Sequence, residues 1–194
     1  MIVIFLGPPG AGKGTQAAIT AARHDIPQLS TGDMLRAAIA AGSDVGQRAK
    51  SIIDAGELVS DDVVAGIVSE RIDMQDCEAG FLLDGFPRTI EQAHMLDRML
   101  TEKRRDLTAV IELQVDEERL VERLNARVAE AKAKGEPVRS DDNETTFRNR
   151  LGVYRDQTAP LIPHYQSKGL LRHVDGMQAI EAVSSEIERV LTQA

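Results

Sequence analysis

The stretch GPPGAGKGT at residues 7–15 follows the apolar run IVIFL at residues 2–6. Backbone N–H groups in a glycine-rich turn can point together at one anion, and a helix that starts where the turn ends adds the positive end of its dipole. The four glycines allow the backbone angles that such a turn needs, and Lys13 supplies a point charge for the outer phosphates of a nucleotide. The stretch therefore predicts a loop that binds nucleotide phosphates.

The residue after the lysine, where such a loop usually carries a hydroxyl that binds a metal ion, is Gly14, and Thr15 stands one place later. Glycine has no side chain, so a metal ion here needs another anchor. Mg²⁺ readily keeps several of its waters, and a carboxylate elsewhere in the chain can hold it through water. Asp84, which ends the apolar part of GFLLDG at 80–85, is the candidate for that anchor.

Three runs, at 2–6, 80–85 and 107–115, read as central parallel strands, which are continuously apolar because both faces are buried. Two weaker strand candidates are residues 27–31 and 170–175. Helical patterns lie between the strands, at 13–23, 33–40, 45–54, 61–73, 89–100, 117–134, 143–157 and 177–192. Strands that alternate with helices predict an α/β fold with a parallel sheet covered on both sides.

The composition excludes several classes of protein. A chain of 194 residues forms one domain most easily, and its 42% hydrophobic residues are typical of a globular protein. The net charge of -8 and pI near 5.1 give no basic surface for nucleic acid or an anionic membrane. Aromatic residues make up only 3% of the chain and none is Trp, which argues against stacking on single-stranded bases.

Cys77 is the only cysteine, so the chain can form no internal disulfide and no zinc site built from several thiolates. The N-terminal apolar run is too short for a signal peptide, and no basic residue precedes it. No apolar stretch approaches the ~20 residues that a membrane span needs. We expect a cytoplasmic protein without a membrane partner.

Two further segments predict a second phosphate site. LSTGDMLR at 29–36 and LLDGFPRT at 82–89 each combine the end of a strand, a glycine, an arginine and the start of a helix. Ligands of open parallel sheets bind at the carboxyl ends of the strands, where these residues fall. Alone, the arginines that come later in the chain are typical of solvated surface charge, but together with two phosphate-binding segments they suggest guanidinium clamps.

Five motifs together resemble the adenylate kinases, a family of nucleoside monophosphate kinases. They occur in the order of that family and span nearly the whole chain: GPPGAGKGT, LSTGDMLR, LLDGFPRT with Gln92 three residues on, RSDDNETTFRNRL at 139–151, and VDG at 174–176. In this family the residue after the loop lysine is normally glycine, so Gly14 is the expected variant rather than a defect.

The resemblance implies a P-loop NTPase-type core with a five-stranded parallel sheet flanked by helices, interrupted by two smaller parts. The core would comprise residues 1–29, 60–126 and 141–194, with a helical NMP-binding insert at 30–59 and a lid at 127–140. The lid is too short for the β-rich, often zinc-binding subdomain of the long bacterial form. The chain resembles the short-lid class.

The resemblance also assigns residues to the two nucleotides and to the chemistry. For ATP they are Gly10, Ala11, Gly12, Lys13, Gly14, Thr15, Arg123, Arg127 and Gln178, the last through its backbone at the adenine. For AMP they are Thr31, Arg36, Glu57, Leu58, Val59, Gly85, Phe86, Pro87, Arg88, Gln92, Arg139 and Arg150. Charge neutralisation during transfer is expected from Lys13, Arg88, Arg123, Arg139 and Arg150.

The implied reaction is the reversible, Mg²⁺-dependent conversion of ATP and AMP to two ADP by a monomeric enzyme. A UMP/CMP kinase of the same family is the alternative, although Thr31 and Thr89 favour AMP because pyrimidine-specific relatives tend to replace both. A GTPase-like switch is the alternative outside the family, but the chain has no guanine-reading NKxD motif.

The absence of cysteine from the lid generates a test. We expect the purified protein to contain no stoichiometric zinc, and a strong chelator to leave its melting temperature unchanged while stopping catalysis by removing Mg²⁺. Metal analysis and a thermal melt with and without chelator measure both effects. One tightly bound zinc per chain would contradict this interpretation of the lid.

Overall fold

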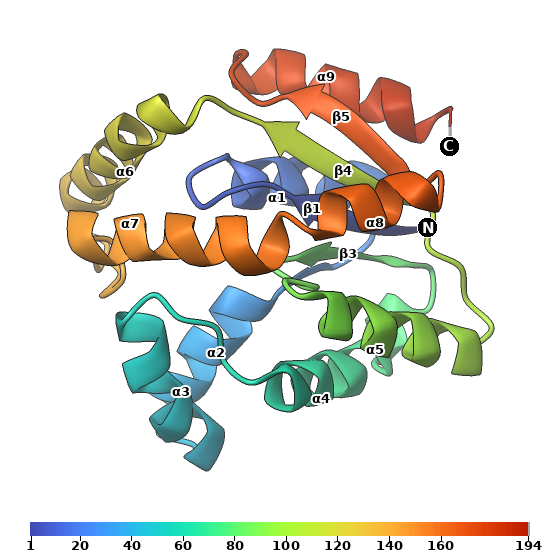
Figure 1. Ribbon diagram of the computed structural model, residues 1–194, viewed down its shortest axis with the longest axis horizontal. Coiled ribbons are helices and arrows are strands. Elements are labelled where there is room, and N and C mark those ends of the chain that lie inside the picture. The colour runs from blue at the N-terminus through green and yellow to red at the C-terminus, as the bar shows by residue number, and fades with distance from the viewer. Residues whose placement is uncertain (194) are drawn as a thin grey trace.

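The expected parallel sheet is present in a computed structural model, which describes residues 1–193. Its strands are β1 (Ile2–Leu6), β2 (Gln28–Ser30), β3 (Phe81–Asp84), β4 (Ala109–Gln114) and β5 (Leu171–Asp175). They pair in the order β2-β3-β1-β4-β5, and every pairing is parallel (Figure 1). The sequence-based assignment of all five strands is therefore confirmed.

Helices cover both faces of this sheet (Figure 1). The α-helices are α1 (Lys13–His24), α2 (Thr31–Ala40), α3 (Asp44–Asp54), α4 (Asp61–Ile72), α5 (Ile90–Glu102), α6 (Leu120–Lys134), α7 (Glu144–Val153), α8 (Leu161–Ser167) and α9 (Ile180–Leu191). Single 3₁₀ turns form at Gln75–Cys77 and Glu117–Arg119, and a π-helical turn follows α7 at Tyr154–Thr158. Helices α1 and α9 pack together on one face, while α4, α5 and α8 contribute to the core on the other.

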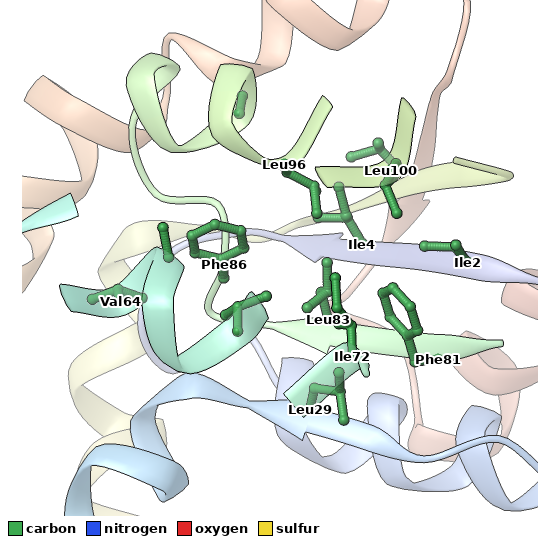
Figure 2. Packing of buried hydrophobic residues seen from close by; sticks show 14 of the residues in the cluster. Ile2, Ile4, Leu29, Val64, Ile72, Phe81, Leu83, Phe86, Leu96 and Leu100 are labelled. Atoms are coloured by element: carbon green, nitrogen blue, oxygen red, sulfur yellow. The ribbon is translucent and has the colours of Figure 1, made fainter. Parts of the chain in front are cut away.

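The arrangement explains why the run IVIFL, which forms β1, is apolar at every position. Ile2, Ile4 and Leu6 belong to the core on the α4–α5 side, where Figure 2 shows Ile2 and Ile4 among side chains of β3 and α5. Val3 and Phe5 belong to the core on the α1–α9 side. Because alternate residues of a strand point to opposite faces, a strand buried on both faces must be apolar throughout.

The register of the strands brings their carboxyl ends to one edge. Phe5 of β1 and Ser30 of β2 both pair with Asp84 of β3, and Leu6 pairs with Glu112 of β4. The segments that follow β1, β2 and β3 therefore leave the sheet side by side. These are the segments that the sequence marks as phosphate-binding.

Three sequence-based expectations differ from the structure. The strand expected at 27–31 ends at Ser30, whose hydroxyl caps α2, so that Thr31 is already helical. The helix expected at 33–40 correspondingly begins two residues earlier, at Thr31.

The third difference is α8, which the sequence does not predict. Its segment contains Pro160 and Pro163, which resemble helix breakers. Both fall at the cap or within the first turn, where backbone N–H groups have no partner inside the helix and proline costs nothing. The helical pattern expected at 143–157 correspondingly divides into α7 and the π turn.

None of the helices in residues 1–193 combines the length and the apolar composition that crossing a bilayer requires.

The contact between α2 and α3 depends on Gly46. A methyl group at this position would overlap the carbonyl group of Ala38, which already accepts a hydrogen bond from the Ser43 backbone N–H. We expect Gly46→Ala to lower the free energy of unfolding by about 1–3 kcal/mol, because rigid backbone must move. Denaturant titration measures this loss.

The matched control is Gly66→Ala, also within a helix, where an added methyl meets no atom within 4 Å. It should raise the free energy of unfolding by roughly 0.5–1 kcal/mol, since alanine is the better helix former. Equal effects of the two substitutions would show that the backbone overlap is not what matters.

Candidate functional site

The glycine-rich loop has the geometry of an anion cradle. Gly7, Gly10 and Gly12 have φ angles of 142°, 82° and 98°, a region that side chains rarely allow. Gly12 is the N-cap residue of α1, so the helix N-terminus opens onto the loop. The Ala11 N–H donates to the Pro8 carbonyl at 3.1 Å and closes the turn. The loop can therefore surround an anion with backbone N–H groups and a helix dipole.

Lys13 lies within the loop, with its ammonium group 2.6 Å from the Gly7 carbonyl oxygen and 3.0 Å from that of Pro8. Burial lowers its pKa to about 8; the Asp84 carboxylate opposes this shift, while Arg88 and Arg150 add to it. Lys13 is thus a buried cation among other cations, a site that favours an anion of high charge.

Asp84 faces the loop from the end of β3. A methyl group at Gly14 would lie 3.6 Å from its Oδ2, so the missing side chain and the carboxylate share one space. The Gln28 side-chain amide donates to the same Oδ2 at 3.2 Å. A hard oxygen donor beside a phosphate-binding loop, with space between them, suits a Mg²⁺ ion that retains its waters.

A cavity extends from the loop toward α2 and α3, and residues of two kinds line it. Its apolar part includes Leu35, Ile53, Leu58, Val59 and Val64. Its polar part includes Lys13, Thr31, Arg36, Glu57, Arg88, Gln92, Asp141 and Arg150. This division suits a ligand with a flat apolar end and an anionic end.

Gly85 joins two of the polar residues. Its carbonyl oxygen accepts from the Thr31 hydroxyl and from Nε of Arg88, both at 2.8 Å. A side chain at Gly85, whose φ is 83°, would come within 2.9 Å of both partners. Burial lowers the pKa of Arg88 to about 10, with Arg150 adding to the shift. Arg88, which lines the cavity, is thus oriented by the hydrogen bond from its Nε.

Two arginines are held by buried carboxylates. Nη1 of Arg150 donates to Asp141 at 2.6 Å, and Arg127 donates two hydrogen bonds to Asp142, one of them from Nε at 3.0 Å. Burial lowers the pKa of Arg150, and Asp141 opposes the shift. The pairs fix the planes of both guanidinium groups.

Further polar contacts join the α2–α3 region to the segment that precedes and forms α7. Asp33 accepts from Arg36 at 2.6 Å and lies 3.6 Å from Arg139. Nδ2 of Asn149 donates to the Ala55 carbonyl at 2.7 Å and to the Glu57 side chain at 2.9 Å. These contacts bring the two parts together at the cavity.

Arg123 lies on the other side of the loop. Its guanidinium group donates to the Ala11 carbonyl at 3.2 Å and to the Gly176 carbonyl at 2.8 Å. It thereby links the glycine-rich loop to the VDG segment. The Gln178 side chain donates to Glu186 on α9 at 3.1 Å.

Most residues expected at the site meet at the carboxyl edge of the sheet, with a few placed differently. Phe86 is fully buried in the core, where Figure 2 shows it beside Val64, so only its backbone can face a nucleotide. Arg123, Arg127, Arg139 and Gln178 do not line the cavity. They surround the loop and the approach to it.

Sequence reasoning missed two cavity residues on the π turn. Tyr154 and Thr158 both line the cavity, and the Thr158 hydroxyl donates to the Arg88 carbonyl at 2.8 Å. Burial raises the pKa of Tyr154 to about 12, and Glu112 and Glu117 add to the shift. No pattern along the chain marks a π turn, although such turns often occur at functional sites.

The four histidines lie away from the cavity. His24 and His173 pair with Glu188 and Glu112, and the rings of His94 and His164 lie 5.6 Å apart. Within residues 1–193, no three His, Cys, Asp or Glu side chains gather in a way that could hold a metal ion directly.

Comparison with known proteins gives this geometry a family. The family model described as "Adenylate kinase" matches residues 5–170. The chain belongs to the adenylate kinase family. It is 59% identical over all 194 residues, and over the whole of both chains, to a protein named adenylate kinase from Brucella melitensis biotype 1. It is 60% identical over 191 residues to the adenylate kinase of Sinorhizobium medicae, covering 98% of this chain and all of the relative.

Membership of the adenylate kinase family confirms the family that the five motifs predict, while the roles of individual site residues stay predictions. The matched region contains the glycine-rich loop, Asp84 and every arginine at the cavity.

The buried ammonium group of Lys13 generates a stability prediction. Its pKa falls from 10.5 in the unfolded chain to about 8, so protonation destabilises the fold fully below pH 8, and this cost disappears as the pH rises toward 10.5. We expect Lys13→Met to raise the free energy of unfolding at pH 7, by about 3 kcal/mol at most, and to lose most of that advantage by pH 10. Denaturant titration at the two pH values measures it.

The control is Lys132→Met, which removes an exposed lysine from α6 and should change stability by less than about 0.5 kcal/mol at either pH. If Lys13→Met is no more stable than the wild type at pH 7, the hydrogen bonds of Lys13 to the loop outweigh the cost of its burial.

Proposed function

We propose that this chain is an adenylate kinase that catalyses the reversible conversion of ATP and AMP to two ADP. The observation that carries the proposal is the position of Lys13, which belongs to the glycine-rich loop and also lines the arginine-rich cavity. A phosphoryl group held by the loop would therefore face an anion held by Arg88 and Arg150. Two adjoining phosphate sites are what phosphoryl transfer between nucleotides requires.

The chemistry needs no general base from the protein. An oxygen of the AMP phosphate, already anionic near pH 7, attacks the γ-phosphorus of ATP; that bond forms as the bond to the β–γ bridging oxygen breaks, and ADP leaves. Positioning and charge neutralisation supply the rate. We assign the neutralisation to Lys13, Arg88, Arg123, Arg139 and Arg150.

On the donor side, residues Gly10 to Thr15 would hold the ATP phosphates with their backbone N–H groups. Arg123 and Arg127 would contact ATP from the base of the lid, and the backbone of Gln178 would lie near its adenine. The hydrogen bonds of Arg123 to the loop and to Gly176 support this assignment, because they place the arginine between the two.

On the acceptor side, the apolar part of the cavity would take the adenine of AMP and the polar part its phosphate. The base and sugar would contact Thr31, Leu58, Val59, Gly85 and Gln92, together with Glu57 and the backbone of Phe86 and Pro87. The phosphate would be held by Arg36, Arg88, Arg139 and Arg150. Support comes from Arg36, Arg88 and Arg150, which line the cavity, and from Arg139, which lies 3.6 Å from Asp33, the partner of Arg36.

Asp84 and Gly14 together would accommodate Mg²⁺ through its waters, as the space between them allows. The ion, when bound, neutralises charge on the donor phosphates. The side chain of Gln28 orients the carboxylate by its hydrogen bond to Oδ2. That the protein uses no zinc stays a prediction.

We further propose that residues 30–59 and 127–140 move as an insert and a lid against the core. Their closure would exclude the water that otherwise hydrolyses ATP. The contacts of Asp33 with Arg139 and of Asn149 with Glu57 support this, because they are of the kind that a closed form would make. A monomeric, cytoplasmic enzyme is the simplest setting for this function.

An assay that couples ADP formation to NADH oxidation tests the proposal. We expect turnover with ATP and AMP, and at least about tenfold lower kcat/KM with UMP or CMP. Lys13→Met is the inactive control, because it removes the positive charge that would neutralise the transferred phosphoryl group. Preference for UMP or CMP would replace the proposal with its alternative, a pyrimidine nucleotide kinase.

The several N–H donors of the Arg88 guanidinium group generate a further prediction. Its Nε is anchored on the Gly85 carbonyl, and a lysine there keeps the charge but cannot make that contact and reach a phosphate in parallel. We expect Arg88→Lys to cost on the order of 2 kcal/mol, roughly 30-fold in kcat/KM for AMP. Steady-state kinetics with saturating ATP measures it.

Arg98→Lys, at an exposed position of helix α5, which begins two residues after Arg88, is the matched control and should leave kcat/KM unchanged. Near-normal kcat/KM in Arg88→Lys would show that a single point charge is sufficient at this position.

A further inference from the structure

The lining of the cavity includes a polar side chain, that of Gln92, whose orientation the structure determines. Gln92 is only 1% exposed and lines the cavity. It lies in the first turn of α5, beside the first turn of α4, and Figure 1 shows the two helices side by side. The orientation of its amide decides which hydrogen bonds a nucleobase could make here.

The neighbours of Gln92 allow only one orientation of the amide. Oε1 accepts from the Arg88 backbone N–H at 2.7 Å, and Nε2 donates to Oδ1 of Asp61 at 2.8 Å. A backbone N–H can only donate, and a carboxylate can only accept. The reversed amide would place donor against donor and oxygen against oxygen, so both neighbours exclude it.

Asp61 is itself held in place. Its Oδ1 also accepts from the Thr89 hydroxyl at 3.1 Å, and that hydroxyl in turn accepts from the Gln92 backbone N–H at 3.1 Å. Asp61 belongs to the first turn of α4, where the helix dipole favours a negative charge. The carboxylate is therefore a fixed reference for the amide of Gln92.

The amide has hydrogen-bonding capacity left for a ligand. Nε2 carries a second N–H and Oε1 a second lone pair, and within residues 1–193 neither has a further hydrogen-bond partner. A base edge opposite it must accept at the position facing Nε2 and donate at the position facing Oε1. Adenine meets this requirement with N1 and its 6-amino group, whereas a 6-oxopurine has N1–H and an oxygen and opposes it at both positions.

We propose that Asp61 is a specificity-determining positioning residue, which locks the Gln92 amide in the orientation that pairs with a 6-aminopurine and rejects a 6-oxopurine monophosphate. The inference rests on the proposed function, since it takes AMP as the occupant of the cavity. Asp61 acts through Gln92 and contacts no substrate itself.

IMP is the diagnostic probe, because it differs from AMP only in the 6-oxo group and the proton on N1. CMP is not diagnostic, since cytosine presents the same donor and acceptor order as adenine and differs in size. For the wild type we expect kcat/KM for AMP to exceed that for IMP at least about 30-fold, because two buried pairs are opposed in the IMP complex.

The test is Asp61→Asn, which keeps the shape but can turn either an oxygen or an NH₂ group toward Gln92. We expect the ratio of kcat/KM for AMP to that for IMP to fall about tenfold, on the scale of one charge-assisted hydrogen bond, with KM for ATP unchanged. Asp62→Asn, an exposed neighbour in the same helical turn, removes the same charge and should leave the ratio at its wild-type value.

The outcomes separate the possibilities. A parallel fall in activity toward AMP and IMP, or an unchanged ratio, overturns the inference and gives Asp61 a purely structural role. If Asp61→Asn does not fold, Asp61→Ser, whose hydroxyl both donates and accepts, is measured in the same way. If the wild type transfers no phosphoryl group to AMP, the proposed function fails; calorimetric affinities of the same variants for AMP and IMP then decide the inference, which an unchanged affinity ratio overturns.

Discussion

Burial of several positive charges at one edge of the sheet is the constraint on which the rest of this structure depends. Lys13, Arg88 and Arg150 share a space that lowers the pKa of all three. Such a cluster destabilises the fold unless anions or fixed dipoles compensate it. Here the compensation comes from Asp84 and Asp141 and from the carbonyl groups of the glycine-rich loop.

The same constraint explains why the site lies where the strands end. Aligned strands place the loop after β1 close to the turn after β3. Charged side chains from distant parts of the chain therefore lie near one another at this edge. The helices of the 30–59 segment and α7 then complete the walls. Their mutual contacts include the hydrogen bond from Asn149 to Glu57, a residue that lines the cavity.

How much of this could be predicted from the sequence depends on how local each signal is. Some signals depend only on neighbouring residues: the run IVIFL, the spacing of the glycines, and Asp84 at the end of a strand. The strands, the loop and the position of Asp84 beside the loop agree with the structure. The sequence does not predict helix α8 because its two prolines look like helix breakers, although the cap and first turn of a helix tolerate proline.

The carboxylates at the site could not be found in the same way. Asp61, Asp141 and Asp142 look like ordinary surface acids in the sequence, and only tertiary structure pairs them with Gln92, Arg150 and Arg127. Asp33 is similar, since its two arginines lie over a hundred residues apart in the chain. A single sequence contains no signal for such pairings.

The carbonyl oxygen of Gly85 has a mechanical consequence. It accepts from Thr31, the first residue of α2, and from Arg88, and two acceptances use both of its lone pairs. A rotation at the start of α2 that moves the Thr31 hydroxyl would therefore also shift the Gly85 carbonyl oxygen that accepts from Arg88. Any tilt of helices α2 and α3 relative to the sheet would therefore also change the direction of the Arg88 guanidinium group.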